Sequence, residues 1–254
     1  MAPVTVECYR CGQPQTDASR ALDSWLASTE TDHSFLPMMR CRIAGQANGE
    51  CEDIYYIAIE DGKVLARLWN GWGRHENAVG NWGNFMTVEA ARGKGIGRLL
   101  LDTWYEDLQQ YGQLPLGLFC SAGAGLIDLY GRYGFTRAIP GRGMLYKPLG
   151  NSPTDFRELC EGYYCTAKQL TVRPATVQWR HEIDCLLKFS LSAHGEAFGL
   201  PGCKSLEEAI VWPHIGQASL VFTKKNRPVG WGFTGRDGKT HWQLHPVYRS
   251  QFEG

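Results

Sequence analysis

Short runs of alternating apolar and polar residues, separated by glycine and asparagine turns, dominate the start of the chain. Residues 4–9 predict an opening strand, and an amphipathic helix follows it. β-Branched and aromatic side chains fill residues 53–59, and a second apolar run covers residues 63–69. Asp61 and Gly62 separate these two runs, and such a dipeptide between strands predicts a hairpin.

The pattern then changes between strand and helix. The expected elements are a strand at residues 84–88, a helix at 97–111, a strand at 114–120, a short helix at 125–133 and a closing strand or strand pair at 136–146. This mixed order predicts an α/β fold with one mixed, mostly antiparallel sheet and helices on both of its faces.

The second half of the chain partly repeats the first. Small and turn-forming residues at 149–153 predict a linker. Beyond it we expect a strand at residues 169–173, a helix at 178–191, a hairpin of residues 218–223 and 229–234, and a strand at 240–245. Similar sequence offsets between the halves suggest an internal repeat. We therefore predict one domain at residues 1–149 and a partial, degenerate copy of it at residues 150–254.

Charge and composition exclude several classes of protein. The 26 basic residues balance the 26 acidic ones, so no overall field favours nucleic acid or an anionic membrane. We expect no membrane span, because no run reaches about 18 apolar residues. The N-terminus lacks the pattern of a signal peptide, and the nine cysteines are an odd number. Both features predict a reducing, cytoplasmic location.

The cysteines offer only a weak metal-binding pattern. Cys8 and Cys11 form one Cys-x-x-Cys pair, whereas Cys160 and Cys165 are five residues apart. A structural zinc site needs two closely spaced pairs. We therefore interpret the cysteines as free thiols and expect no metal.

The strongest chemical signal is the run of residues 87–100, Thr-Val-Glu-Ala-Ala-Arg-Gly-Lys-Gly-Ile-Gly-Arg-Leu-Leu. A predicted strand ends, the chain turns through Gly93, Gly95 and Gly97, and a helix begins at once. Glycines allow close backbone approach, and amides at a helix N-terminus bind anions such as pyrophosphate. A dinucleotide fingerprint is disfavoured because Leu100 replaces its third glycine, and no Gly-Lys-Ser or Gly-Lys-Thr indicates a P-loop.

A second motif, Leu-Tyr-Gly-Arg-Tyr-Gly-Phe at residues 129–135, ends the next short helix. Together the two motifs resemble those of the GNAT superfamily of acyl-CoA-dependent N-acyltransferases. The resemblance is clearest from Phe85 to Phe135 and extends in outline from Val4 to Lys147. Two positions depart from the family pattern, since Gly123 replaces a frequent asparagine and Leu126 a usual alanine.

The resemblance implies an acetyl-CoA site. It assigns the CoA pyrophosphate to six backbone amides, those of Arg92, Gly93, Lys94, Gly95, Ile96 and Gly97. It places the pantetheine arm antiparallel to a strand formed by Phe85, Met86 and Thr87. Tyr130 aligns with the tyrosine that protonates the departing CoA thiolate, for which a phenol with a pKa near 10 is suited.

A general base must accept a proton from the attacking amine. Glu76 and Glu89 are equal candidates, and His75 is a rival. The aromatic loop at residues 69–76 is interpreted in two ways, as the wall of an acceptor pocket or as a cover for the sheet.

The expected reaction moves an acetyl group from acetyl-CoA to a primary amine through a tetrahedral intermediate. The acceptor is a small molecule or a peptide, and a homodimer is an alternative to a monomer. Two other classes stay open, a non-catalytic acyl-CoA sensor or assembly module and a nucleotide-binding protein.

Overall fold

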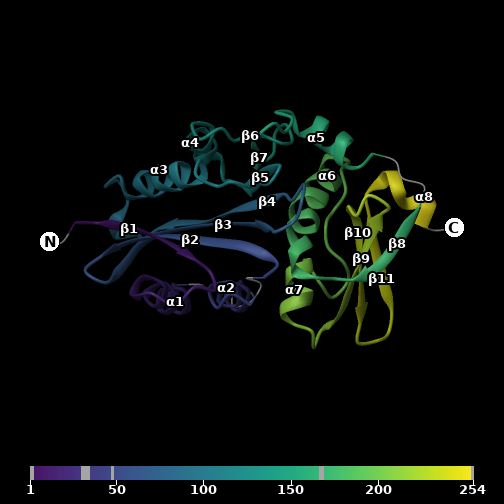
Figure 1. Cartoon of the computed structure of the whole chain (residues 1–254), viewed down its shortest axis with the longest axis horizontal. Coiled ribbons are helices and arrows are strands. Elements are labelled where there is room, and N and C mark those ends of the chain that lie inside the picture. Colours follow the sequence, from purple (N-terminus) through teal and green to yellow (C-terminus); the bar gives the residue numbers. More distant parts are fainter. Residues whose placement is uncertain (1–2, 30–34, 47–48, 166–168, 253–254) are drawn as a thin grey trace. The chain divides into compact units, whose positions relative to one another are not determined.

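The computed structural model in Figure 1 describes residues 3–29, 35–46, 49–165 and 169–252. The chain divides into two compact units. The first unit holds residues 1–74 and 82–114, and the second holds residues 75–81 and 115–254. Residue 149 lies inside the second unit, and a division into independently folding pieces there stays a prediction. No helix in the described ranges has both the length and the apolar character of a membrane span.

Seven strands form one sheet in the order β1-β2-β3-β4-β5-β7-β6. They are β1 (Thr5–Arg10), β2 (Cys51–Glu60), β3 (Lys63–Gly73), β4 (Gly80–Thr87), β5 (Gly117–Ser121), β6 (Thr136–Arg137) and β7 (Met144–Pro148). β4 and β5 run parallel, with Gly80 opposite Leu118, whereas β1 with β2, β2 with β3, and β7 with both β5 and β6 are antiparallel. The predicted mixed, mostly antiparallel sheet is confirmed.

The first unit is built around the hairpin of β2 and β3. Asp61 and Gly62 form its turn with φ angles of 48° and 72°, as a type I′ turn requires. Helices α1 (Asp17–Thr29) and α2 (Phe35–Ile43) lie on one face of these strands, and α3 (Ile96–Leu108) lies on the other (Figure 1). Successive side chains of β2 alternate between the two faces, so β2 is buried through its centre.

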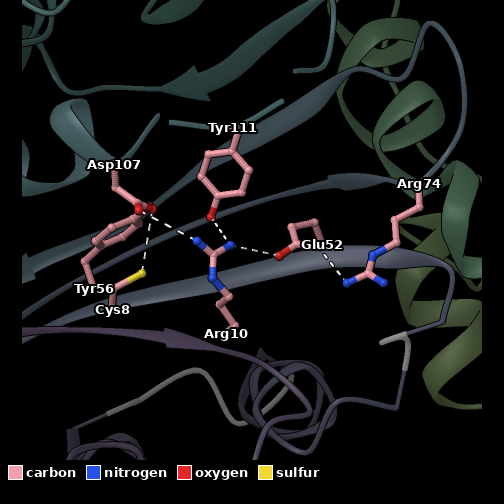
Figure 2. Close-up of polar contacts among 7 residues, drawn as sticks. All are labelled: Cys8, Arg10, Glu52, Tyr56, Arg74, Asp107 and Tyr111. Carbon is pink, nitrogen blue, oxygen red and sulfur yellow. Dashed lines mark hydrogen bonds and ion pairs between the residues drawn. The ribbon is translucent and has the colours of Figure 1, made fainter. Parts of the chain in front are cut away.

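A network of polar side chains ties the C-terminal end of α3 to β1 and β2 (Figure 2). The Tyr56 hydroxyl donates to Asp107 Oδ2 at 2.6 Å, and Arg10 Nη2 lies 3.7 Å from Asp107 Oδ1. The Cys8 thiol also faces Asp107, with Sγ 3.7 Å from Oδ2. Burial and the hydrogen bond to Asp107 raise the pKa of Tyr56 far above its ordinary value, so its hydroxyl stays a donor.

The same network continues through Arg10 (Figure 2). Arg10 Nη1 donates to Glu52 Oε1 at 3.2 Å and to the Tyr111 hydroxyl. Glu52 accepts a second bond from Arg74 Nη2 at 2.7 Å. Positive and negative side chains therefore alternate in the order Arg74, Glu52, Arg10 and Asp107. These contacts hold the C-terminal end of α3, which lies far from the glycine turn at its N-terminal end.

The second unit contains a separate antiparallel sheet in the order β11-β10-β9-β8. Its strands are β8 (Leu170–Pro174), β9 (Gly216–Thr223), β10 (Pro228–Gly235) and β11 (Thr240–Leu244). The predicted hairpin and the strand after it are therefore present. The π-helix η4 (Glu182–Leu187) contacts β10, and α7 (Leu206–Val211) contacts β9.

Aromatic side chains join β5 and β7 to the helices of the second unit. The Phe119 ring lies 5.3 Å from Tyr146, 5.8 Å from Phe156 and 5.2 Å from Phe189, measured between ring centroids. Phe156 begins α5 (Phe156–Tyr163), and Phe189 lies in α6 (Lys188–Ala193). Strands β5 and β7 thus share one core with α5 and α6.

Two expectations about the elements are corrected. The helix expected at residues 178–191 is not one α-helix, because η3 (Val177–Trp179), the π-helix η4 and α6 follow one another there. The aromatic loop expected at residues 69–76 begins later, because β3 continues to Gly73. Trp69 and Trp72 lie in β3 and are 1% and 5% exposed, so these two tryptophans cover the sheet.

Candidate functional site

The glycine turn of the first unit connects β4 to α3. Strand β4 ends at Thr87, a 3₁₀ turn η1 (Glu89–Ala91) follows, and α3 begins at Ile96. Gly93 and Gly95 have φ angles of 75° and 79°, a backbone shape that glycine adopts without strain. Residues 92–95 are all exposed. The predicted strand, turn and helix are therefore present, with the turn open to solvent.

The glycines of this turn serve two different purposes. A Cβ at Gly93 or Gly95 would meet no described atom within 4 Å, so both positions leave space beside the backbone. A Cβ at Gly97 would lie 3.2 Å from Phe85 Cζ and 3.3 Å from Thr87 Oγ1. Gly97 therefore allows α3 to pack closely on β4, whereas Gly93 and Gly95 shape the open turn.

The first amides of α3 are available as donors. The N-cap residue is Gly95, and no described side chain caps the helix. The first N–H groups of any α-helix lack a carbonyl partner within that helix, and the helix dipole adds partial positive charge there. The turn therefore has the backbone features of an anion site, and its assignment to the CoA pyrophosphate stays a prediction.

The strand residues assigned to pantetheine lead into this turn. Phe85 and Thr87 are half-buried and Met86 is 36% exposed. Asn84 has a φ of 52°, which interrupts regular strand geometry just before them. The Thr87 carbonyl accepts a bond from Arg92 Nε at 3.2 Å, so one acceptor of this strand already has a partner.

Tyr130 belongs to the second unit. It lies in α4 (Ile127–Gly131), follows the 3₁₀ turn η2 (Ala124–Leu126) and is 4% exposed. Burial, with a contribution from Cys120, raises the pKa of Tyr130 above its ordinary value. The phenol therefore keeps its proton through the neutral range, as a general acid must. Its role in acyl transfer stays a prediction.

The two candidate bases occupy different surroundings. Glu89 is exposed at the start of η1 in the first unit. Glu76 is exposed in the second unit and lines a cavity of about 290 Å³ together with His75, Tyr163 and Trp179. Neither carboxylate is distinguished by its contacts, so the choice between them stays open.

His75 has a buried partner that the sequence did not reveal. Glu182 is fully buried, and its Oε1 accepts from Val79 N at 2.9 Å and lies 3.4 Å from His75 Nε2. The His75 ring also packs on Trp179, with centroids 4.0 Å apart. Burial alone would lower the pKa of His75, but the hydrogen bond and charge of Glu182 outweigh burial and raise it. The sequence offered little signal for this contact, because Glu182 lies among the other polar residues Arg180, His181 and Asp184.

The side chains that could bind a metal ion are the last feature of the site. All nine cysteines are free thiols. Within the described part of the chain, no three His, Cys, Asp or Glu residues are grouped so that they could hold a metal ion.

Residues 51–137 match the family model described as Acetyltransferase (GNAT) domain. The chain contains a GNAT domain. The match includes the open glycine turn, β4 and Tyr130, and it confirms the resemblance found in the two motifs. The α/β fold with a mixed seven-stranded sheet is typical of this family.

Several solved structures are similar to the GNAT domain. One is an acyl-CoA N-acyltransferase of Pseudomonas aeruginosa, at 22% identity and a TM-score of 0.41, covering 57% of this chain and 97% of that one. Another is a GNAT family acetyltransferase of Brucella melitensis in complex with acetyl-CoA. Its sequence identity is 19% and its TM-score 0.42, and the match covers 59% of this chain and 92% of that one. A third is a GNAT family N-acetyltransferase of Escherichia coli in complex with CoA. Its sequence identity is 14% and its TM-score 0.42, and the match covers 59% of this chain and 85% of that one. No curated protein matches the chain in sequence.

Proposed function

We propose that the protein is an N-acyltransferase that moves an acetyl group from acetyl-CoA to a primary amine. The observation that carries this proposal is the exposed, uncapped turn at residues 92–95, which leads into α3 within a GNAT domain. Its donors are directed by the backbone, so they stay in place whether or not a ligand is bound.

In this proposal the amides of residues 93–97 bind the pyrophosphate of the co-substrate, whereas the Arg92 N–H expected to join them donates to the Glu89 carbonyl at 3.1 Å. The open space beside Gly93 and Gly95 lets phosphate oxygens approach the backbone closely. The exposed side chains of Arg92 and Lys94 add positive charge at the same turn. The backbone of Phe85, Met86 and Thr87 then pairs with the amides of the pantetheine arm as an added strand would.

The proposed chemistry is direct attack. The amine nitrogen attacks the thioester carbonyl carbon, and a tetrahedral intermediate forms. The carbon–sulfur bond then breaks, Tyr130 donates its phenolic proton to the leaving thiolate, and Glu76 or Glu89 accepts the proton lost by the amine. Cys120 is a poor candidate for an acyl-enzyme, because burial raises its pKa and keeps it a neutral thiol.

We further propose that the second sheet belongs to a partial copy of the same fold. The order β8, helix, α7, β9, β10, β11 repeats the order β1, α1, α2, β2, β3, β4. Both sets of four strands also keep chain order across their sheets. In this interpretation the second half is a degenerate GNAT-like domain.

The proposed acceptor is a small molecule or a peptide with a free amine. The balanced net charge disfavours strongly charged polymers as acceptors. Nine free thiols suit a reducing, cytoplasmic location. A homodimer is the alternative to a monomer.

A binding and turnover assay on the full chain tests the function. Acetyl-CoA at a hundredfold excess over its Kd should raise the free energy of unfolding by about 2.7 kcal/mol. Chromatographic detection of free CoA, with mass spectrometry of the products, should then find turnover with one class in a panel of amino acids, polyamines, aminoglycosides and peptides. Saturable binding without CoA release for any amine would favour the sensor. No binding heat and no stabilisation at millimolar acetyl-CoA would overturn both functions.

A further inference from the structure

The second unit contains a cavity of about 800 Å³ that the proposed acyl transfer does not use. Its walls come from α5, α6, the residues that precede β7 and the residues that follow β11. The lining includes none of the residues assigned above to acetyl-CoA. Cavities of this volume hold organic molecules of drug size.

Much of the wall is apolar, and the charges at its edge cancel. Ile139, Phe156 and Val247 supply aliphatic and aromatic surface. Arg157 and Glu161 also line the cavity, and Arg157 Nε lies 2.9 Å from Glu161 Oε1. The pair is exposed and its two charges are opposite, so it gives the lining no net charge that would favour a charged ligand.

Two stacked rings form the polar part of the wall. His245 lies flat on Tyr164, with centroids 4.0 Å apart and an interplanar angle of 11°, and His194 meets His245 edge-on at 5.5 Å. Burial, His194 and Arg249 lower the pKa of His245 to about 4, so its imidazole is neutral at pH 7. His245 Nδ1 accepts from Val247 N at 3.4 Å, so the ring hydrogen is on Nε2, which is a donor.

The orientation of His194 is also fixed. Its Nδ1 lies 2.8 Å from the Ser190 carbonyl, and because a carbonyl only accepts, this nitrogen carries a hydrogen. Nε2 of His194 is then the ring nitrogen that the protein leaves for another partner. The cavity wall thus offers one imidazole donor from His245 and a second imidazole nitrogen from His194.

Cys160 and Ser190 complete the lining without adding charge. Burial raises the pKa of Cys160 to about 12, against a smaller opposing effect of Ser190, so Cys160 is a neutral thiol. The Ser190 hydroxyl is buried and adds no charge to the wall.

We propose that this cavity binds an uncharged aromatic molecule that carries a hydroxyl group. The stacked rings and Phe156 present flat surface, and the two imidazoles of His194 and His245 match a hydroxyl group, which can both donate and accept. A charged ligand would lose its hydration with no unpaired opposite charge in the lining, which is unfavourable. The cavity volume, the paired charges at its edge and the neutral polar groups all favour this one class.

Calorimetric titration of the full chain at pH 7 with matched probes tests the proposal. The uncharged phenols 2-naphthol and 4-phenylphenol are compared with the anions 2-naphthoate and 4-phenylbenzoate. At least one phenol should bind at least about tenfold more tightly than its carboxylate partner. If neither phenol binds, or if the carboxylates bind as tightly, the proposal is wrong.

Cavity-filling variants locate the binding. Ala193→Phe and Val247→Trp each place a large ring at the cavity wall and should weaken phenol binding by at least about tenfold. Ala27→Phe, at an exposed position of α1, is the matched control and should change it by less than about twofold. Retained circular dichroism shows that each variant folds. Unchanged phenol binding in both folded cavity variants would overturn the assignment, whatever the acetyltransferase assay shows.

Discussion

Each unit contains a strand that leads through a 3₁₀ turn into a helix, but the two turns differ in their free donors. In the first unit β4 leads through η1 and four exposed residues to α3. In the second unit β11 leads through η5 (Pro246–Tyr248) directly to α8 (Arg249–Phe252), with no glycine between them. The order of elements is the same, so the difference lies in the backbone amides.

The turn of the second unit satisfies its own amides. Pro246 has no N–H group, Val247 N donates to His245 Nδ1 at 3.4 Å, and Tyr248 N donates to the His245 carbonyl at 2.9 Å. The turn before α3 has no such side-chain cap among the described residues. Both 3₁₀ turns make backbone bonds, since Ala91 N donates to the Val88 carbonyl at 3.0 Å, so the difference lies in the histidine cap and in the glycines that follow η1.

The largest expected effect comes from closing the open turn. Gly95→Val adds a side chain where the structure has free space, so it should block phosphate from the amides, at the cost of backbone strain from the positive φ of 79°. Acetyl-CoA affinity, measured by titration calorimetry, should fall at least about 100-fold, which is about 2.7 kcal/mol.

The control is Gly62→Val in the β2–β3 turn. Gly62 also has a positive φ and no described atom within 4 Å of an added Cβ, so it carries similar backbone strain. Acetyl-CoA affinity should stay within about twofold of wild type. Equal losses in the two variants would mean that strain, and not a phosphate site, explains the effect.

Tyr130→Phe tests whether the second unit contributes the general acid of the proposed reaction, although its own strand–turn–helix segment has no open glycine turn. Acetyl-CoA affinity should be kept, and kcat should fall by about 100-fold if the phenol is the general acid. Because burial raises the pKa of Tyr130, the wild-type rate should not decline at alkaline pH until above the ordinary phenol pKa of about 10. Tyr133→Phe, on the same segment, should leave kcat within about twofold. An unchanged kcat in Tyr130→Phe would assign Tyr130 to packing.

His245→Asn tests the cap that closes the second turn. The folded-state pKa of His245 is about 4 and the ordinary value is 6.5, so between these values the unfolded chain binds a proton that the folded chain does not. The free energy of unfolding therefore keeps its full value above pH 6.5, and protonation of His245 in the unfolded chain lowers it as pH falls towards 4. Asparagine caps without titrating.

Urea unfolding at pH 7 and pH 4.5 measures this effect. Wild type should lose about 2 kcal/mol more than His245→Asn over that interval. The exposed His214 provides the matched control, and His214→Asn should lose as much as wild type. The same loss in wild type and His245→Asn would contradict a cap that depends on neutral His245.

The smallest effects belong to the network at the other end of α3. Asp107→Asn weakens the bonds to Tyr56 and Arg10 and should lower the free energy of unfolding by about 1 kcal/mol. Arg74→Ala removes one exposed ion pair with Glu52 and should change the free energy of unfolding by less than about 0.5 kcal/mol. Acetyl-CoA affinity should be unchanged in both. A tenfold loss in Asp107→Asn would mean that the network also shapes the open turn.

The features that the sequence predicted well depend on neighbouring residues. Asp61 and Gly62 specify their turn through their own φ angles, and the glycine turn before α3 needs only a run of adjacent positions. Helix α5 also had a local signal that was overlooked, since Asp155 caps it by accepting from Glu158 N at 3.1 Å.

Other features depend on contacts that no local pattern encodes. The π-helix at residues 182–187 has the composition of an ordinary buried helix, so its hydrogen-bond register could not be predicted. Glu182 reaches Val79 across 103 residues and lies beside His75. The sequence therefore offered His75 as a rival candidate base but did not reveal the carboxylate of Glu182 that helps to raise its pKa.

The membership of residues 75–81 in the second unit has a consequence for synthesis on the ribosome. All residues of the first unit have been made once residue 114 is added, so this unit can fold early. The segment at residues 75–81 emerges before most of that unit, yet the carboxylate that accepts from Val79 N belongs to residue 182. Part of β4 must therefore wait in the nascent chain while about 100 further residues are translated, and the second unit is expected to fold last and most slowly.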